Sequence, residues 1–219
     1  MAPPQGAAVV LVHGLWLGRF ALAPWRWQFE RRGFNVLAFG FPSRAPFAGN
    51  ARELAAFIAA LPAHEVYCLG HSLGGLLILE VLRQGAASGD GGARKIRRAV
   101  LAGAPVAGSA SASRLARSRA GRWMVGGAIH ALATRPAPEP VATQTEIGVI
   151  AGTGGKGLGR ASGALGLPND GAITVAETRL ACARDSVTLP VSHSAMLLSP
   201  AVVAQACNFF ANGRFTRHE

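Results

Sequence analysis

Short apolar runs alternate with amphipathic segments along most of the chain. Such runs, free of internal charges, predict strands that are buried on both faces of a sheet. The segments between them place apolar residues at helical spacing and predict helices. The predicted strands are 7–14, 35–41, 65–70, 98–105, 145–152 and 185–192, and the predicted helices are 23–33, 51–61, 73–85 and 200–213. This order predicts an α/β fold, in which a mostly parallel central sheet carries helices on both faces.

Two stretches depart from this alternation. Residues 106–144 predict one or two helices followed by a Pro-rich segment, and residues 153–169 are Gly-rich, which predicts a loop. Insertions that follow the carboxyl ends of parallel strands lie where such sheets bind ligands. We therefore expect a single domain over 1–219, in which 106–144 form either a small cap over a site or a helix pair at the edge of the sheet.

The composition supports one folded domain. Half of the 219 residues are apolar, which is enough for a substantial core. The apolar run at 7–12 is too short to cross a bilayer, and the residues before it lack the basic start of a secretory signal, so we expect a cytoplasmic protein. Cys68, Cys182 and Cys207 have no Cys-x-x-Cys spacing, which argues against a zinc site or a disulfide framework. Cys68 lies in a predicted strand, where a free thiol behaves as a small hydrophobe.

The net charge of +11 comes almost entirely from arginine, since Lys95 and Lys156 are the only lysines. Arginines cluster at 94–98 and at 114–122, without exposed aromatic residues or a recognition motif beside them. A nucleic-acid-binding protein normally shows one of these features, so we expect no specific nucleic-acid partner. The charge predicts a solvated basic surface that allows weak contact with anionic ligands or membrane surfaces. It does not define a function or an oligomeric state.

The sequence GHSLG at 70–74 places one serine between glycines, after a predicted strand and before a predicted helix. Each glycine inside a continuous helix costs about 1 kcal/mol relative to alanine, so Gly70, Gly74 and Gly75 indicate a sharp turn. The pattern G-x-S-x-G between a strand and a helix is typical of a nucleophile elbow. Such a turn presents Ser72 at the start of a helix, whose first amide groups favour developing negative charge.

On these features the chain resembles the α/β-hydrolase superfamily, particularly its small lipase- and esterase-like members. The resemblance extends from VLVHGLW near the start to SHSAMLL near the end. It implies a nucleophile, an acid and a histidine in that order along the chain. A serine hydroxyl needs a base, and the base needs an acid that orients it. His193 follows the last predicted strand, where the family's catalytic histidine lies. The resemblance gives His13 a structural role beside the oxyanion loop, and His71 is expected to point away from Ser72's side of the turn.

The acid is assigned to Asp170, which lies in the loop PNDGAITVAET between the last two predicted strands. Related small hydrolases carry their acid in such a loop. Asp90 is expected to be a turn residue, and Asp185 begins the last strand at the opposite edge of the sheet. Glu177 is the reserve candidate for the acid.

The oxyanion hole requires two backbone N–H donors. The resemblance assigns one to Leu73, which follows the nucleophile, and the other to Leu15 in the HGLW sequence, with Trp16 as a neighbour. Leu15, Trp16 and Leu73 would together form an apolar acyl pocket, with Trp16 in contact with substrate, although core packing explains Leu73 equally well.

The resulting hypothesis is a serine hydrolase that cleaves carboxylic esters, without a metal or organic cofactor, on a small-molecule or lipid ester. Acyl transfer by the same residues and a non-catalytic binding protein of this fold are the alternatives. The sequence GTGGKG at 152–157 formally matches G-x-G-x-x-G, but the glycines and proline that follow do not predict the helix that a dinucleotide site requires.

Overall fold

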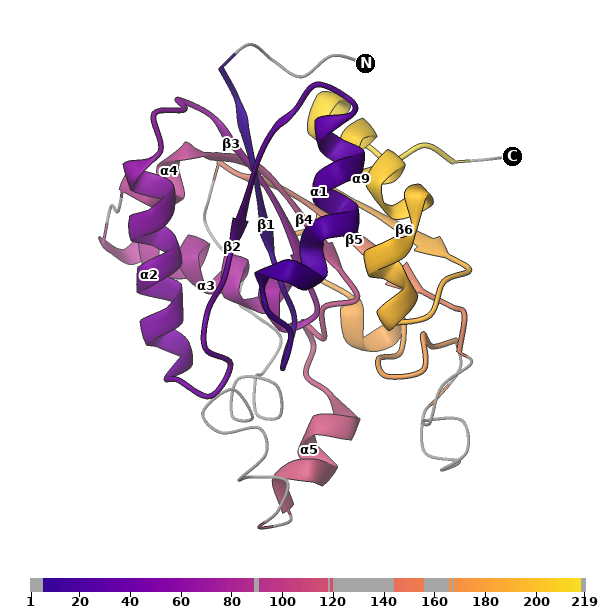
Figure 1. Cartoon of the computed structure of the whole chain (residues 1–219). Coiled ribbons are helices and arrows are strands. Elements are labelled where there is room, and N and C mark those ends of the chain that lie inside the picture. Colours follow the sequence, from indigo (N-terminus) through magenta and orange to yellow (C-terminus); the bar gives the residue numbers. More distant parts are fainter. Residues whose placement is uncertain are drawn as a thin grey trace.

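The computed structural model describes residues 6–88, 91–117, 119, 144–155, 166 and 168–217. Its centre is a parallel sheet with the strand order β2-β1-β3-β4-β5-β6 (Figure 1). The strands are β1 (Ala8–Val12), β2 (Asn35–Phe39), β3 (Val66–His71), β4 (Ile96–Ala102), β5 (Glu146–Gly152) and β6 (Asp185–Leu189). Because all strands point the same way, the loops that follow them meet at one end of the sheet. This confirms the predicted α/β fold.

Helices cover both faces of the sheet. Figure 1 shows α1 and α9 on one face and α2, α3 and α4 on the other. The helices are α1 (Ala23–Glu30), α2 (Phe47–Ala60), α3 (Leu73–Ser88), α4 (Gly91–Lys95), α5 (Ala110–Arg117) and α9 (Pro200–Asn212), with the 3-10 helices η1 (Arg19–Leu22), η2 (Ala176–Thr178) and η3 (Ser194–Leu198). Within the described ranges no helix is both long and apolar enough to cross a membrane.

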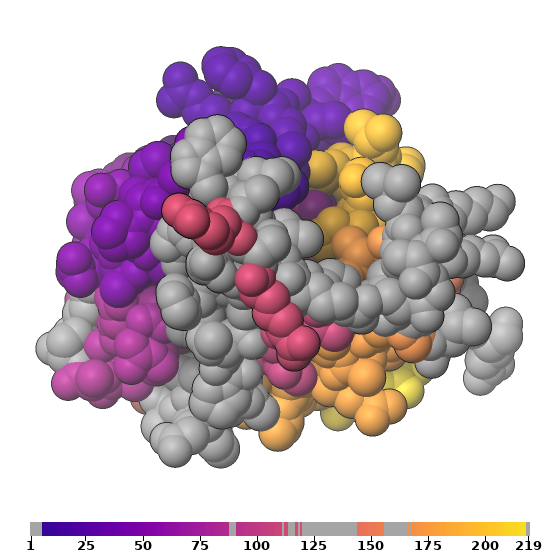
Figure 2. Space-filling model, turned by 90° about the horizontal axis from the view of Figure 1, so that it is seen from below, coloured from indigo at the N-terminus to yellow at the C-terminus, as the bar shows by residue number. Residues whose placement is uncertain are grey.

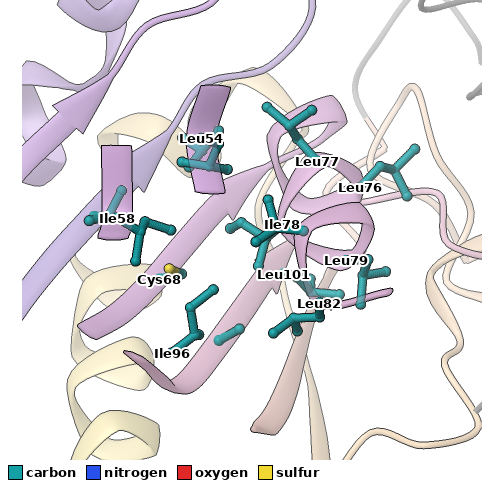
Figure 3. Packing of buried hydrophobic residues seen from close by; sticks show 14 of the residues in the cluster. Leu54, Ile58, Cys68, Leu76, Leu77, Ile78, Leu79, Leu82, Ile96 and Leu101 are labelled. Carbon is teal, nitrogen blue, oxygen red and sulfur yellow. The ribbon is translucent and has the colours of Figure 1, made fainter. Parts of the chain in front are cut away.

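The core consists of two apolar layers, one on each face of the sheet. Successive side chains of a strand point to opposite faces. Val10 and Val12 of β1 accordingly belong to the layer under α2 and α3, while Val9 and Leu11 belong to the layer under α1 and α9. Both layers exclude water, which explains why the strands are continuous apolar runs. Figure 3 shows part of the first layer.

Cys68 confirms the expectation of a buried thiol. It lies in the layer under α2 and α3, between Ile58 and Ile96 in Figure 3. Burial away from water raises the pKa of the Cys68 thiol far above its usual value, because the interior disfavours the thiolate. All three cysteines are free.

The helix boundaries differ most from the prediction at α2 and α4. Helix α2 begins at Phe47, directly after Pro46, rather than at residue 51. The basic cluster at 94–98 contains the end of the unpredicted α4 and the start of β4, where Ile96 is buried. Of the predicted cap at 106–144, the structure describes α5 and its neighbours, and the remainder lies outside the described residues. The same holds for most of 153–169, including Lys156 of the GTGGKG sequence.

Candidate active site

Ser72 lies in a sharp turn at the carboxyl end of β3, one of the two central strands of the sheet. It is one of two non-glycine residues with positive φ among those described, at φ 53°. An L-residue in this region costs roughly 1–2 kcal/mol, so the surrounding structure must hold it there. Its amide donates a hydrogen bond to the Ala102 carbonyl of β4 at 2.9 Å, and its carbonyl accepts the Gly75 amide at 3.0 Å. The turn thus places Ser72 directly after the carboxyl end of β3.

Close backbone contacts around this turn require glycine. A β-carbon at Gly74 would overlap the carbonyl oxygens of Val12 and His13 in β1 and the loop after it. A β-carbon at Gly70 would lie 2.5 Å from the Gly75 nitrogen. The first turn of α3 therefore packs directly on two strands, which fixes the position of Ser72.

Gly74→Ala is therefore expected to lower the free energy of unfolding by about 3 kcal/mol, because the added methyl group meets backbone that cannot move aside. Gly18→Ala is the control, since Gly18 has φ −112° and no atom within 4 Å of the position of an added β-carbon. Urea unfolding of the two variants measures the difference. Equal stability of the two would contradict the close packing of the elbow.

Asp170 and His193 form a hydrogen-bonded pair. His193 Nδ1 lies 2.7 Å from Asp170 Oδ2, and the His193 amide donates to the Asp170 carbonyl at 2.9 Å. The other carboxylate oxygen, Oδ1, accepts the amides of Ala172 at 2.9 Å and Ile173 at 2.7 Å. The Asp170 side chain is 1% exposed, whereas that of His193 is 19% exposed. The carboxylate is thus held rigidly below an imidazole that has access to solvent.

The His193 imidazole also packs against the elbow. The ring of His71, directly before Ser72, lies 4.7 Å from the His193 ring, centroid to centroid. His71 Nε2 lies 2.9 Å from the carbonyl oxygen of His193. A carbonyl only accepts, so this nitrogen carries the proton and donates. The turn that holds Ser72 is therefore bonded to the loop that holds His193, across 122 positions of sequence.

Ser72 and His193, both within the described residues, share no side-chain hydrogen bond in this structure. Such bonds between nucleophile and base are often long in unliganded enzymes and tighten with substrate. Gly103, directly after β4, lies against the Asp170–His193 pair, since a β-carbon there would sit 3.2 Å from His193 Nδ1 and 3.3 Å from Asp170 Oδ2. The structure thus gathers all three predicted residues at one end of the sheet.

The loop after β1 passes beside the elbow. A β-carbon at Gly14 would lie 3.2 Å from the Ser72 β-carbon, so the next residues are close to the hydroxyl. Among the described residues, the amides of Leu15 and Leu73 have no hydrogen-bond acceptor. The Trp16 amide donates to Ser43 Oγ at 3.2 Å. The two amides predicted for the oxyanion hole are thus available, and that of Trp16 is engaged.

The side chains of this region differ in exposure. That of Leu73 is fully buried in the core under α2 and α3, so packing accounts for it and it does not line an acyl pocket. Leu15 packs against the same layer from its edge. Trp16 is 57% exposed and has φ 57°, so its indole remains accessible for the predicted contact with substrate.

His13 braces this loop. Its Nδ1 lies 2.8 Å from the Gly14 carbonyl and its Nε2 accepts the Phe41 amide at 3.2 Å, while its ring stacks on that of Phe41. One nitrogen must donate and the other accept, which requires the neutral imidazole. Burial lowers the pKa of His13 and favours that form.

The alternative acids have other contacts. Asp185 begins β6 at the far edge of the sheet, where it accepts the amides of Phe215 and Ser186 and pairs with Arg217. Glu177 accepts the amides of Ala110 and Thr174 and so joins the start of α5 to the loop after Asp170. Asp90 lies outside the described residues. Of the described candidates, Asp170 is the acid that contacts His193.

A family model described as the alpha/beta hydrolase family matches residues 9–206, which is most of the chain. The chain belongs to the alpha/beta hydrolase family. A search among curated protein sequences found no match.

Solved structures with the same fold include hydrolases of two kinds. The mature lipase BlEst2 of Bacillus licheniformis aligns with a TM-score of 0.67 and 20% identity, over 89% of this chain and 88% of that one. Its propeptide form has a TM-score of 0.74 and 19% identity, over 99% of this chain but 53% of the longer protein. The RedJ thioesterase of the prodiginine pathway in Streptomyces coelicolor has a TM-score of 0.61 and 14% identity, over 96% and 88%. At these identities the likeness concerns the fold.

His71 is the residue of this alpha/beta hydrolase site that the sequence analysis missed. The sequence predicts that His71 points away from Ser72's side of the turn. Its hydrogen bond to the His193 carbonyl becomes visible only in the folded chain, because the two residues are 122 positions apart. The side chain is buried, and its Nδ1 has no hydrogen-bond partner among the described residues. Burial, together with the neighbouring His193, lowers the pKa of His71 to about 3. His71 is therefore a neutral brace between the elbow and the His193 loop.

This lowered pKa predicts how stability depends on pH. Between about pH 6.5 and pH 3 the unfolded chain protonates His71 and the folded chain does not, so the stability due to this residue is complete above pH 6.5 and falls by about 1.4 kcal/mol per pH unit below it. His71→Gln removes this titration. Urea unfolding should show the difference between wild type and variant changing by about 2–3 kcal/mol from neutral pH to about pH 4.5. A constant difference would show that His71 is protonated in the folded chain.

Proposed function

We propose that the protein is a serine hydrolase that cleaves carboxylic esters through an acyl-enzyme on Ser72. The observation that carries the proposal is the Asp170–His193 hydrogen bond of 2.7 Å, held against a turn that keeps Ser72 at positive φ. Membership of a hydrolase family and the lipase fold neighbours support it. Ser72 is the nucleophile, His193 the general base, and Asp170 the acid that orients the imidazole.

In the proposed reaction, Ser72 Oγ attacks the ester carbonyl carbon while His193 Nε2 takes the hydroxyl proton. The carbonyl oxygen becomes an oxyanion, which accepts hydrogen bonds from the amides of Leu15 and Leu73. The tetrahedral intermediate breaks its bond to the alcohol oxygen, and His193 gives its proton to that oxygen. Water then attacks the acyl-serine, losing a proton to His193, and the acid leaves as the proton returns to Ser72. The steps use no metal or organic cofactor.

The position of Asp170 makes this sequence of proton transfers feasible. Its Oδ1 is occupied by two backbone amides, so Oδ2 faces the imidazole and accepts from Nδ1–H. This leaves Nε2 unprotonated and able to accept the Ser72 proton. The carboxylate also stabilises the imidazolium that forms.

A second substrate class is favoured by the fold neighbours. RedJ and BorB are thioesterases with TM-scores of 0.61 and 0.64, and a thioester differs from an ester only in its leaving group. The same residues would form the same acyl-serine from either. Acyl transfer would follow if an alcohol replaced water in the second step.

Covalent labelling tests the enzyme proposal directly. A fluorophosphonate probe should modify the folded protein at Ser72, as located by peptide mass spectrometry, and Ser72→Ala should abolish the label. Parallel kinetics with matched acyl esters and thioesters of short and medium chain length then separate the substrate classes. Absence of labelling, together with ligand binding that Ser72→Ala leaves intact, would instead identify a binding protein.

A further inference from the structure

Three of the four exposed large apolar side chains among the described residues belong to η1, α1 and η3, and the fourth is Trp16 in the loop after β1. Phe20 of η1 is 82% exposed, Leu198 of η3 is 65% exposed, and Trp27 of α1 is 57% exposed. Helix η1 leads directly into α1, and Trp27 and Leu198 line the same cavity of about 620 Å³. Scattered single apolar residues are normal on a protein surface, but a cluster of aromatic residues marks an interaction site.

Arginines surround these side chains. The segment 19–32, which spans η1 and α1, contains four arginines and one glutamate, a net charge of +3. That glutamate, Glu30, is paired with Arg26 at 2.7 Å. The guanidinium carbon of Arg31 lies 4.6 Å from the centre of the Trp27 ring, and that of Arg19 lies 5.5 Å from the centre of the Phe20 ring. Arg31 and Arg32 line the cavity with Trp27.

We propose that this surface, formed by Phe20, Trp27 and Leu198 with Arg19, Arg31 and Arg32, binds the surface of an anionic lipid membrane; we call it the α1 face. Exposed aromatic and leucine side chains insert at the boundary between headgroups and acyl chains, and arginines beside them bind lipid phosphates. The proposal concerns binding and does not depend on the chemistry at Ser72.

The α1 face adjoins the end of the sheet that holds the candidate active site. Helix η3 begins directly after His193, and the buried Trp25 of α1 joins the two helices by donating from Nε1 to the Met196 carbonyl at 2.8 Å. Figure 2, which looks onto this end, shows indigo atoms of the N-terminal segment along one border, next to yellow atoms of the last part of the chain. A membrane on the α1 face would therefore lie beside the site.

Co-sedimentation with vesicles tests the proposal. The full chain with Ser72→Ala, which prevents hydrolysis, is mixed with unilamellar vesicles of equimolar phosphatidylglycerol and phosphatidylcholine, or of phosphatidylcholine alone. The double variant Phe20→Ser/Trp27→Ser removes the exposed rings. The pair Arg31→Gln/Arg32→Gln removes two charges from the α1 face. The matched control, Arg94→Gln/Arg97→Gln, removes two exposed arginines in α4 and at the start of β4, and α4 lies on the face of the sheet opposite α1.

We expect binding to the anionic vesicles and at least tenfold weaker binding to phosphatidylcholine. The aromatic double variant should bind the anionic vesicles at least tenfold more weakly than the parent. Arg31→Gln/Arg32→Gln should bind these vesicles roughly 25-fold more weakly, since each arginine near an anionic surface contributes about fivefold to the affinity. The control pair should change the affinity less than threefold. Equal losses from both arginine pairs, full binding by the aromatic variant, or no binding at all would overturn the proposal. Near-UV circular dichroism checks that each variant is folded, and hydrolysis of soluble esters by the Ser72 form of each variant separates this result from the proposed activity.

Discussion

Replacing Ser72 with alanine is expected to lower kcat for a short p-nitrophenyl ester by a factor on the order of 10⁴ to 10⁶, the range seen when a serine nucleophile acts as a unit with its base. The loss is expected to be large because the reaction proposed above forms its covalent intermediate on the Ser72 hydroxyl, which alanine lacks. Alanine has the same backbone preference as serine in this region, so the free energy of unfolding should be unchanged. Initial rates and a urea unfolding curve measure both quantities.

The control for this variant is Ser186→Ala. Ser186 lies in β6 with an exposed side chain, so the same loss of a hydroxyl there should leave kcat unchanged. If Ser72→Ala retained turnover within tenfold of wild type, the ester hydrolysis would proceed elsewhere, and the assignment of Ser72 as nucleophile would be wrong.

The strands and their parallel arrangement could be predicted because both faces of the sheet are covered. In β1 every side chain is buried, and the sequence is accordingly a continuous apolar run. The boundaries of the helices were harder to predict from the sequence than the strands. The short α4 has only five residues and two terminal basic side chains, so it has no periodicity that a sequence pattern would reveal. The start of α2 depends on where the loop after β2 packs, which is a tertiary property.

The candidate site shows the same division between local and tertiary information. The turn at Ser72 is encoded locally, because Gly70 and Gly74 are required wherever the backbones of β3, α3 and β1 touch. Asp185 could be set aside from the sequence because it begins a strand, whereas the choice of Asp170 depended on the resemblance to related small hydrolases. The bond from His71 to His193 joins residues 122 positions apart, and no spacing within either segment indicates it.

The side chains of Leu15 and Leu73 do not indicate the role proposed for these residues. Their role in the proposed oxyanion hole depends on backbone groups, which every residue carries. The Leu73 side chain packs in the core and contributes nothing to a pocket. Of the two interpretations that the sequence left open for the Leu73 side chain, a pocket wall or core packing, the structure supports core packing.

Replacing Asp170 with asparagine is expected to lower kcat by a factor of about 10⁴, with little change in shape at the site. Asp170 Oδ1 accepts the amides of Ala172 and Ile173. In the variant only the amide oxygen can keep those two bonds, so the NH₂ group must face His193 Nδ1. That nitrogen would then have to accept, which places the imidazole proton on Nε2. An imidazole protonated at Nε2 cannot take the Ser72 proton.

This prediction separates an electronic role of Asp170 from a structural one. Asp185→Asn is the matched control, because Asp185 also accepts two backbone amides but lies at the opposite end of the sheet. It should lose stability, through its bonds to the C-terminal segment, and keep kcat. Asp170→Asn should keep most of its stability and lose kcat. If instead both variants lost stability and neither lost turnover, Asp170 would be a brace for the loop, and the base at Ser72 would be oriented by another group.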